Sequence, residues 1–366
     1  MNSVFNFLTK GDRSPLYSVL GSFFLTLLVI VIGSWIPFPF LNGDLISYFA
    51  DLPSDKRSQL SIIALGISPF FTVLQLVEIV KLIFPRLDKW QLSRDDNAYR
   101  MNVAVNVLVI LVTAIQGYGV ISALTAVGSV DVSASTMFVG ILTYVAMSVV
   151  IIWLANLNRL PGIESGIWVL AALYGLMALP TKLTDFLAAI QAGSIQRIEG
   201  LAFVVVMVIA ILLIGVGNRL ILAVNSAGNT SSIVFSSILL WPPFVVNALV
   251  AFLLGILFLA LPETKLDVSN YLIIARVIVL PILIPLIVYA YYRRFSICYP
   301  DLVNQKHVRL VLFWVASIQV IISVGFGVLA SYVSSLHMPS VGFFISTVTV
   351  LFAFGVLLRR FVSPER

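Results

Sequence analysis

Apolar runs long enough to cross a lipid bilayer recur along the whole chain. A transmembrane helix needs about 20 mainly apolar residues. Ten runs of this kind cover residues 17–36, 60–84, 101–125, 136–157, 163–180, 200–222, 233–261, 271–292, 308–334 and 340–358. Only 10% of the 366 residues are charged, whereas soluble domains carry about a quarter. We therefore predict an all-α, multi-pass membrane protein with ten transmembrane helices.

The positions of Lys and Arg predict the orientation of these helices, because cytoplasmic loops carry an excess of both residues. If the N-terminus lies in the cytoplasm, most of the 22 Lys and Arg residues fall on the inner side. The outer exceptions are Lys56, Arg57, Lys182, Arg197, Lys265 and Arg276. An even number of spans also places the C-terminus in the cytoplasm. This bias explains the net charge of +6 without a nucleic-acid partner.

Several kinds of site are not expected. Cys298 is the single cysteine, so no intrachain disulfide can form. His307 and His337 are too far apart in the sequence for metal-ligand spacing. The short loops offer no phosphate-binding glycine loop and no cluster of nucleophile, base and orienting acid. We therefore expect no catalytic residues, no bound metal and no cofactor.

The second predicted span, Leu60–Pro85, combines helix-breaking and polar residues. Gly66 and Pro69 interrupt its start, and Glu78 lies near its end. In lipid, free backbone groups are tolerated only where they are buried in protein or line a wet cavity. A charge near the bilayer centre costs about 2.5–3.5 kcal/mol on insertion scales. The segment is thus expected to face other helices or water, unless Glu78 extends to the interface from the helix end.

Further interruptions indicate a repeated architecture. Proline pairs lie in the seventh span, at Pro242 and Pro243, and in the eighth, at Pro281 and Pro285. Broken spans in both halves suggest two five-helix repeats around a central site. We expect an N-terminal half at 17–180 and a C-terminal half at 198–358, with cytoplasmic segments at 1–16 and 359–366. A solute transporter usually needs charges at mid-membrane, and their scarcity here favours a passage with an apolar constriction.

Motifs in the first half resemble the SecY family of protein-conducting channels. They are "IPFP" at 36–39, "LSIIALGISPFF" at 60–71, "AIQGYG" around Gln116 and "WLANLNRLPGIESGI" at 153–167. The "SSILLWPPFVVNA" sequence is similar to the family's proline-bearing seventh span. The resemblance follows the chain in span order and is strongest between residues 30 and 170.

The resemblance implies a two-halved clamshell around an hourglass pore, through which unfolded polypeptide crosses the membrane. The family's apolar pore ring comes from spans two, five, seven and ten, and the matching positions here are Ile67, Phe71, Leu170 or Ala171, Phe244 and Ile345. A lateral gate between spans two and seven would release apolar segments into lipid. Its expected polar members are Thr72, Glu78, Gln116 and Ser236, of which Glu78 replaces a glutamine usual in the family. Plain packing is the alternative role for each of these residues.

Three departures from the family pattern affect the expected partners. Residues 42–59 lack the family's plug motif and would form a reduced plug at most. "GIESG" replaces the family's "GIGNG", and the loops between spans six and seven and between eight and nine are short. The basic docking face is reduced to Arg293, Arg294, Lys306 and Arg309, which could equally be a solvated positive-inside loop. A SecA-type motor or a ribosome is therefore in doubt, whereas SecE-like and SecG-like subunits are implied by the family.

These departures suggest an accessory SecY relative with few substrates, by default in a bacterial plasma membrane, with an organelle membrane of bacterial descent left open. Two alternatives remain. A ten-helix secondary transporter would need Glu78 or Arg276 for uptake. A non-conducting scaffold would tolerate polar substitutions at Ile67, Phe71 and Phe244.

Overall fold

The computed structural model of the protein describes residues 14–52, 54–126, 128, 133–158, 160, 163, 165–225, 231–260, 278–298, 306–332 and 340–362. Within these ranges the regular structure is helical, apart from one isolated antiparallel bridge between Pro37 and Ser61. The predicted all-α architecture is confirmed. The long helices are α2 (Ser14–Trp35), α5 (Ser68–Ile83), α7 (Asp95–Ala126), α8 (Ala134–Leu157), α9 (Ile167–Gln191), α10 (Arg197–Asn225), α11 (Ser231–Ala260), α13 (Leu280–Cys298), α15 (Lys306–Tyr332) and α16 (Val341–Val362).

Seven helices in the described part of the chain are long and apolar enough to cross a membrane. They are α7, α8, α9, α10, α11, α15 and α16, and the core of α2 is a shorter apolar helix. One long helix overlaps each of the ten predicted spans. The predicted spans at 271–292 and 163–180 begin with residues that lie partly outside the described ranges. Ten membrane crossings therefore stay a prediction, and a multi-pass membrane protein is shown.

The start of the second predicted span is not helical, which corrects its expected boundary at residue 60. Residues 62–67 form successive turns, and Gly66 has a left-handed φ of +48°. The helix α5 begins at Ser68, with Pro69 in its first turn. Proline is tolerated there because its missing N–H has no intrahelical acceptor. The glycine turn thus places Ile67 at the N-cap of α5 and starts the helix inside the protein.

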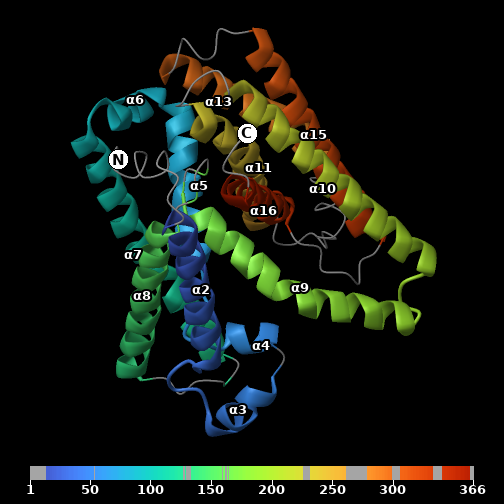
Figure 1. The fold of residues 1–366 in the computed structure, drawn as a ribbon. Coiled ribbons are helices and arrows are strands. Elements are labelled where there is room, and N and C mark those ends of the chain that lie inside the picture. The colour runs from blue at the N-terminus through green and yellow to red at the C-terminus, as the bar shows by residue number, and fades with distance from the viewer. Residues whose placement is uncertain are drawn as a thin grey trace.

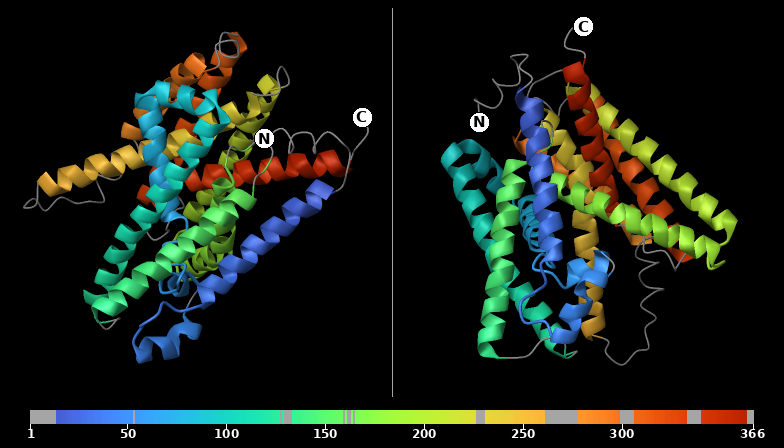
Figure 2. Two further views of the ribbon diagram at one scale, coloured as in Figure 1. Left: turned by 90° about the vertical axis from the view of Figure 1, so that its left-hand side faces the viewer. Right: turned by 60° about the horizontal axis from the view of Figure 1, so that its bottom comes forward.

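The helices form two groups joined by a central layer. Figure 1 shows α2, α7 and α8 on one side and α10 and α15 on the other, with α13 at the top between them, above α5. Between them, α5 packs against α11, and α9 packs against α16. Figure 2 places the first turn of α2 and the last turn of α16 at the same end of the molecule. This arrangement agrees with an even number of crossings.

The main hydrophobic core follows the central layer. It contains buried side chains from α5, α9, α11, α13, α15 and α16. The backbone at the start of α9 lies very close to the end of α8. A β-carbon added at Gly166 would lie 2.0 Å from the carbonyl oxygen of Ala155. Only glycine permits that backbone contact. The residues that open α9 therefore enter the core directly.

The predicted plug region forms two short helices and packs away from the main core. They are α3 (Gly43–Tyr48) and α4 (Ser54–Gln59), with a 3-10 turn at Phe49–Asp51 between them. Phe49 is buried in a separate cluster with Phe38, Ile121 and Tyr144. This cluster lies at the C-terminal end of α7 and the N-terminal end of α8. A plug role stays a prediction.

Candidate functional site

Five aromatic rings from four helices meet in the main core. Phe71 stacks on Phe244, with ring centroids 5.1 Å apart and an interplanar angle of 10°. Trp168 and Phe343 each meet both rings at steep angles, at centroid distances from 5.1 to 5.4 Å. Trp241 adds an edge contact to Trp168 at 4.8 Å. We call these five residues the aromatic collar.

The helices that form the aromatic collar are α5, α9, α11 and α16, which are the predicted spans two, five, seven and ten. Glycine or proline residues lie close to the aromatic collar on each of these four helices. The turn at Gly66 precedes α5, and Gly166 starts α9. Pro242 and Pro243 lie inside α11, which is continuous from Ser231 to Ala260, so the expected interruption of the seventh span is wrong. Gly342 begins α16 directly against the ring of Phe244. Small residues at these positions allow close helix packing without a hydrophobic driving force from lipid.

The predicted ring residues all lie in the same core. Phe71 and Phe244 are in direct ring contact, and Ile67, Leu170 and Ile345 are buried in the same cluster. Leu170 and Ala171 are both fully buried, so burial does not distinguish between them. A pore role for these residues stays a prediction.

Sequence reasoning missed Trp168, Trp241 and Phe343. Trp168 is fully buried, and it follows the glycine-rich motif that begins α9. Phe343 similarly follows Gly342 at the start of α16. An aromatic residue just after a helix-starting glycine was the available signal, but only the convergence of the helices makes it meaningful.

The predicted gate residues are partly brought together. The amide nitrogen of Gln116, on α7, donates to the hydroxyl of Thr72, on α5, over 3.4 Å. Thr72 also donates to the carbonyl oxygen of Ser68. Ser236 is buried on α11. The fourth residue, Glu78, instead belongs to a separate cluster of charges. The gate function stays a prediction for all four.

The charge cluster joins α5, α13 and the short helix α6 (Pro85–Ser93). Arg294 binds Glu78 through Nη1 at 2.5 Å and Asp88 through Nε at 2.8 Å. The amino group of Lys81 lies 3.6 Å from an oxygen of each carboxylate. The hydroxyl of Tyr291 donates to Glu78 at 3.0 Å. We call Glu78, Lys81, Asp88 and Arg294 the charge cluster, and each of these side chains is only 5–7% exposed.

The charge cluster shifts the pKa of two groups near the helix ends. Burial alone would raise the pKa of Asp88, but the hydrogen bond and charge of Arg294, with the charge of Lys81, lower it below the ordinary value of 3.8. Burial, followed by the nearby Asp88 carboxylate, raises the pKa of the Cys298 thiol to about 11. Asp88 is therefore ionised, and Cys298 is a neutral thiol, across the physiological range.

The predicted docking residues differ in their surroundings. Arg293 is exposed, whereas Arg294 is buried in the charge cluster and its guanidinium does not face solvent. Arg309 donates to the hydroxyl of Tyr292 over 3.1 Å. The side chain of Lys306 lies outside the described residues. Lys265, Arg276 and His337, which were considered in the sequence, lie wholly outside them. A docking role stays a prediction.

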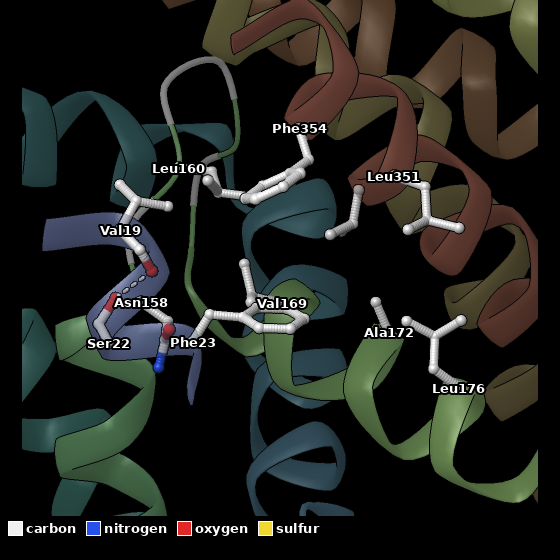
Figure 3. Close-up of a pocket in the computed structure, with 11 residues that line it drawn as sticks. Val19, Ser22, Phe23, Asn158, Leu160, Val169, Ala172, Leu176, Leu351 and Phe354 are labelled. Atoms are coloured by element: carbon white, nitrogen blue, oxygen red, sulfur yellow. Dashed lines mark hydrogen bonds between the residues drawn. The ribbon is translucent and has the colours of Figure 1, made fainter. Parts of the chain in front are cut away.

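An apolar cavity lies apart from the aromatic collar. It has a volume of about 120 Å³ and is enclosed by α2, α9, α16 and the chain before α9. Figure 3 shows Phe23 of α2 and Phe354 of α16 on its walls. Their ring centroids are 6.1 Å apart. Ser22 turns back to donate to the carbonyl oxygen of Val19. The described residues contain no group of His, Cys, Asp or Glu arranged to hold a metal ion.

The chain is similar in sequence to known proteins of one family. The SecY family model matches residues 61–308. The chain is 25% identical over 276 residues to the protein translocase subunit SecY of Pseudomonas aeruginosa, covering 64% of this chain and 62% of that protein. It is 24% identical over 188 residues to the SecY subunit of Buchnera aphidicola subsp. Baizongia pistaciae, covering 47% and 43%. The matches thus span roughly half the length of these relatives.

A solved structure is similar over nearly the whole chain. It is described as showing how the SecY plug domain stabilises the closed state of the translocation channel and maintains a membrane seal. The TM-score is 0.51 at 14% identity, covering 93% of this chain and 91% of that one. This likeness supports the fold alone. Because the family model covers more than half of the chain, the protein is a distant member of the SecY family, whose matching members are protein translocase subunits rather than enzymes.

Proposed function

We propose that the protein is a protein-conducting channel subunit whose constriction is the aromatic collar. It passes unfolded polypeptide across the membrane and releases apolar segments sideways into lipid. The observation that carries this proposal is the meeting of Phe71, Trp168, Phe244 and Phe343 from four different helices at one point. These helices correspond to the spans that the family resemblance assigns to the pore ring.

The physics of an apolar constriction suits this role. A closed set of apolar rings excludes water and so limits ion leak, as hydrophobic gates do by dewetting. Each offset or edge-on aromatic contact contributes about 0.5–1.5 kcal/mol. Such contacts can be exchanged for contacts with a passing chain, because they require no particular side chain from it. The collar can therefore accept many sequences and close again behind each.

The seam between α5 and α11 is proposed as the lateral gate. Across this seam, Phe71 of α5 stacks on Phe244 of α11 with ring centroids 5.1 Å apart, whereas the bond from Gln116 to Thr72 joins α7 to α5 on one side of it. An aromatic contact of this kind contributes about 0.5–1.5 kcal/mol. An apolar segment of about 20 residues gains far more by entering lipid. A sufficiently apolar substrate can therefore offset the cost of opening this seam.

The surrounding arrangement is proposed from the positive-inside bias and the family. Two five-helix halves, at 17–180 and 198–358, would open like a clamshell in a bacterial plasma membrane, with both termini in the cytoplasm. A SecE-like subunit would brace the halves, with a SecG-like subunit beside them. The short loops would leave room for a different motor than SecA or the ribosome, as in an accessory system with few substrates.

Ion leak across the collar tests the proposal. We expect Phe71→Ser with Phe244→Ser to raise the ion conductance of purified protein in planar bilayers, because two hydroxyls would hydrate the constriction. The matched control is Leu212→Ser on α10, whose side chain is 64% exposed. Equal conductance of the two variants would contradict the proposal and favour a scaffold.

A second measurement tests the gate. In a Cys298→Ser background, cysteines at positions 72 and 236 should form a disulfide on oxidation when no substrate is present. A pair that never links would remove the gate from the proposal, whereas the collar would still be tested by its conductance. Uptake of a small solute that depends on Glu78 would support a secondary transporter instead.

A further inference from the structure

The charge cluster connects two parts of the chain that are far apart in the sequence. Its contacts join residues separated by 206 and 216 positions. Glu78 and Asp88 belong to the N-terminal half, on α5 and α6, and Arg294 belongs to the C-terminal half, on α13. The cluster therefore lies across the boundary between the two proposed halves of the channel.

The two cations of the charge cluster differ in whether their ion pairs cross this boundary. Lys81 lies on α5, and both of its carboxylate partners lie on the same side of the boundary as itself. Arg294 lies on the opposite side from both of its partners. Both ion pairs of the charge cluster that cross the boundary consequently pass through the single guanidinium of Arg294.

Neighbouring side chains orient this guanidinium. Tyr291 precedes Arg294 by one helical turn, and its hydroxyl binds the same oxygen of Glu78. The rings of Tyr291 and Phe295 lie 5.6 and 5.5 Å from the guanidinium carbon. One face of α13 thus presents a positive group and a hydroxyl together to α5. A planar guanidinium binds two carboxylates in directions fixed by its N–H groups, whereas an ammonium group acts as a point charge.

Burial makes the cluster act as a two-state contact. The four charged side chains are nearly inaccessible to water. If α13 moved away slightly, Arg294 would lose two carboxylates before water could replace them, and an unpaired buried charge is strongly unfavourable. The contact is therefore either made in full or broken with hydration of both sides. Such bistable contacts convert small movements into discrete transitions.

We propose that Arg294 is a latch that holds α13 against α5 and α6 and must be released for the lateral gate to open. This proposal rests on the proposed channel function. Glu78 lies six residues after Thr72 on α5, which is about 9 Å along a helix axis. The latch and the gate residue therefore move with the same helix. The free energy for release must come from the substrate, so the latch sets how apolar a segment must be to open the gate.

Two variants with equal charge change test the latch. Arg294→Gln and Lys81→Gln each remove one buried cation, and each leaves the charge cluster with one excess negative charge. Only the first removes the ion pairs that cross the boundary, and both variants keep the Tyr291 hydroxyl that binds Glu78. The distance between α6 and α13 can be measured with spin labels on cysteines at positions 90 and 297, where Trp90 and Ile297 are 41% and 43% exposed. Cys298→Ser keeps a donor beside Asp88 in this background.

We expect Arg294→Gln to shift the label distance to longer values and to broaden its distribution, and we expect Lys81→Gln to leave it close to that of the parent. Equal distances in both variants, whether short or long, would overturn the latch, because equal widening would reflect only the unbalanced buried charge. Arg294→Lys is the second test, since it keeps the charge balance of the folded protein. Its point charge should give an intermediate distance, and a distribution like that of the parent would also overturn the latch.

The label measurement needs no transport. If the latch fails while Phe71→Ser with Phe244→Ser still raises conductance, the channel function stands without a latch. If conductance never changes but the distances separate as expected, the contact is real and the proposed function fails.

Discussion

The substitution Gly342→Ala offers a sharp test of how tightly the aromatic collar is packed. A β-carbon at this position would lie 2.8, 2.8 and 3.0 Å from Cδ2, Cε2 and Cζ of Phe244. The ring cannot swing aside freely, because Phe71, Trp168 and Phe343 surround it at 5.1, 5.1 and 5.2 Å between centroids. Either the backbone of α16 or the whole collar must therefore shift.

The expected loss of stability in Gly342→Ala is that of the less costly of two structural responses to the added methyl group. Loss of all three aromatic contacts would cost about 1.5–4.5 kcal/mol at 0.5–1.5 kcal/mol each. A small backbone shift that accommodates an extra methyl group costs about 1–3 kcal/mol. We expect the second response, so Gly342→Ala should destabilise the protein by about 1–3 kcal/mol and should raise ion leak through the displaced collar.

The matched control lies on the same helix. A β-carbon added at Gly355 would meet no atom within 4 Å, so Gly355→Ala should gain up to about 1 kcal/mol from helix propensity alone. Thermal unfolding in mild detergent, followed by intrinsic fluorescence, should rank the midpoints as Gly355→Ala, then the parent protein, then Gly342→Ala. A Gly342→Ala midpoint at or above that of Gly355→Ala would refute the packing argument.

Two further predictions concern the charge cluster and the start of α5. Because the folded-state pKa of Asp88 is lowered from 3.8, its stabilisation should be complete above about pH 5 and should disappear as the pH falls through the lowered value. The midpoint difference between the parent and Asp88→Asn should accordingly be constant from pH 5 to 7 and shrink below about pH 4; a difference that grew on acidification would contradict this. Gly66→Ala should lower the midpoint by the equivalent of about 1–2 kcal/mol, since alanine disfavours the left-handed region that φ of +48° requires. Gly119→Ala, inside α7 with open space around it, should not lower the midpoint, and equal losses in both would show that Gly66 is not constrained.

The sequence was sufficient to predict the helices but not all of their ends. Apolar runs of membrane length require helices, because lipid offers no partner for free backbone groups. The eight-residue error at the start of α5 arose because hydropathy does not register a turn. Gly66 and Pro69 were both visible signals, and the helix begins between them at Ser68. The helix-breaking residues Gly66 and Pro69 therefore determine where α5 starts, and apolar composition alone placed that start too early.

The candidate site was predictable only where the family resemblance named a position. Phe71 and Phe244 were expected to face one another, and they stack. Trp168 and Phe343 were missed, because a buried aromatic residue at a helix start is ordinary until the other helices are placed. Packing, rather than pattern, makes them members of the aromatic collar.

The charge cluster shows the same limit for polar residues. Arg294 was grouped with surface docking residues because it lies beside Arg293 near a helix end. The structure buries it between two carboxylates more than 200 positions away, at Glu78 and Asp88. A sequence shows that a charge is near a helix end, but only the tertiary structure shows whether that end meets water or another helix.

Site-specific photocrosslinking tests the central claim most directly. A photoreactive phenylalanine analogue would replace Phe71 in the aromatic collar or, as the control, Leu212 on the exposed face of α10. A secretory polypeptide stalled during membrane transit would then be irradiated with each variant. We predict a crosslinked adduct from position 71 and none from position 212. Absence of an adduct at position 71, or equal adducts at both positions, would contradict passage of polypeptide through the collar.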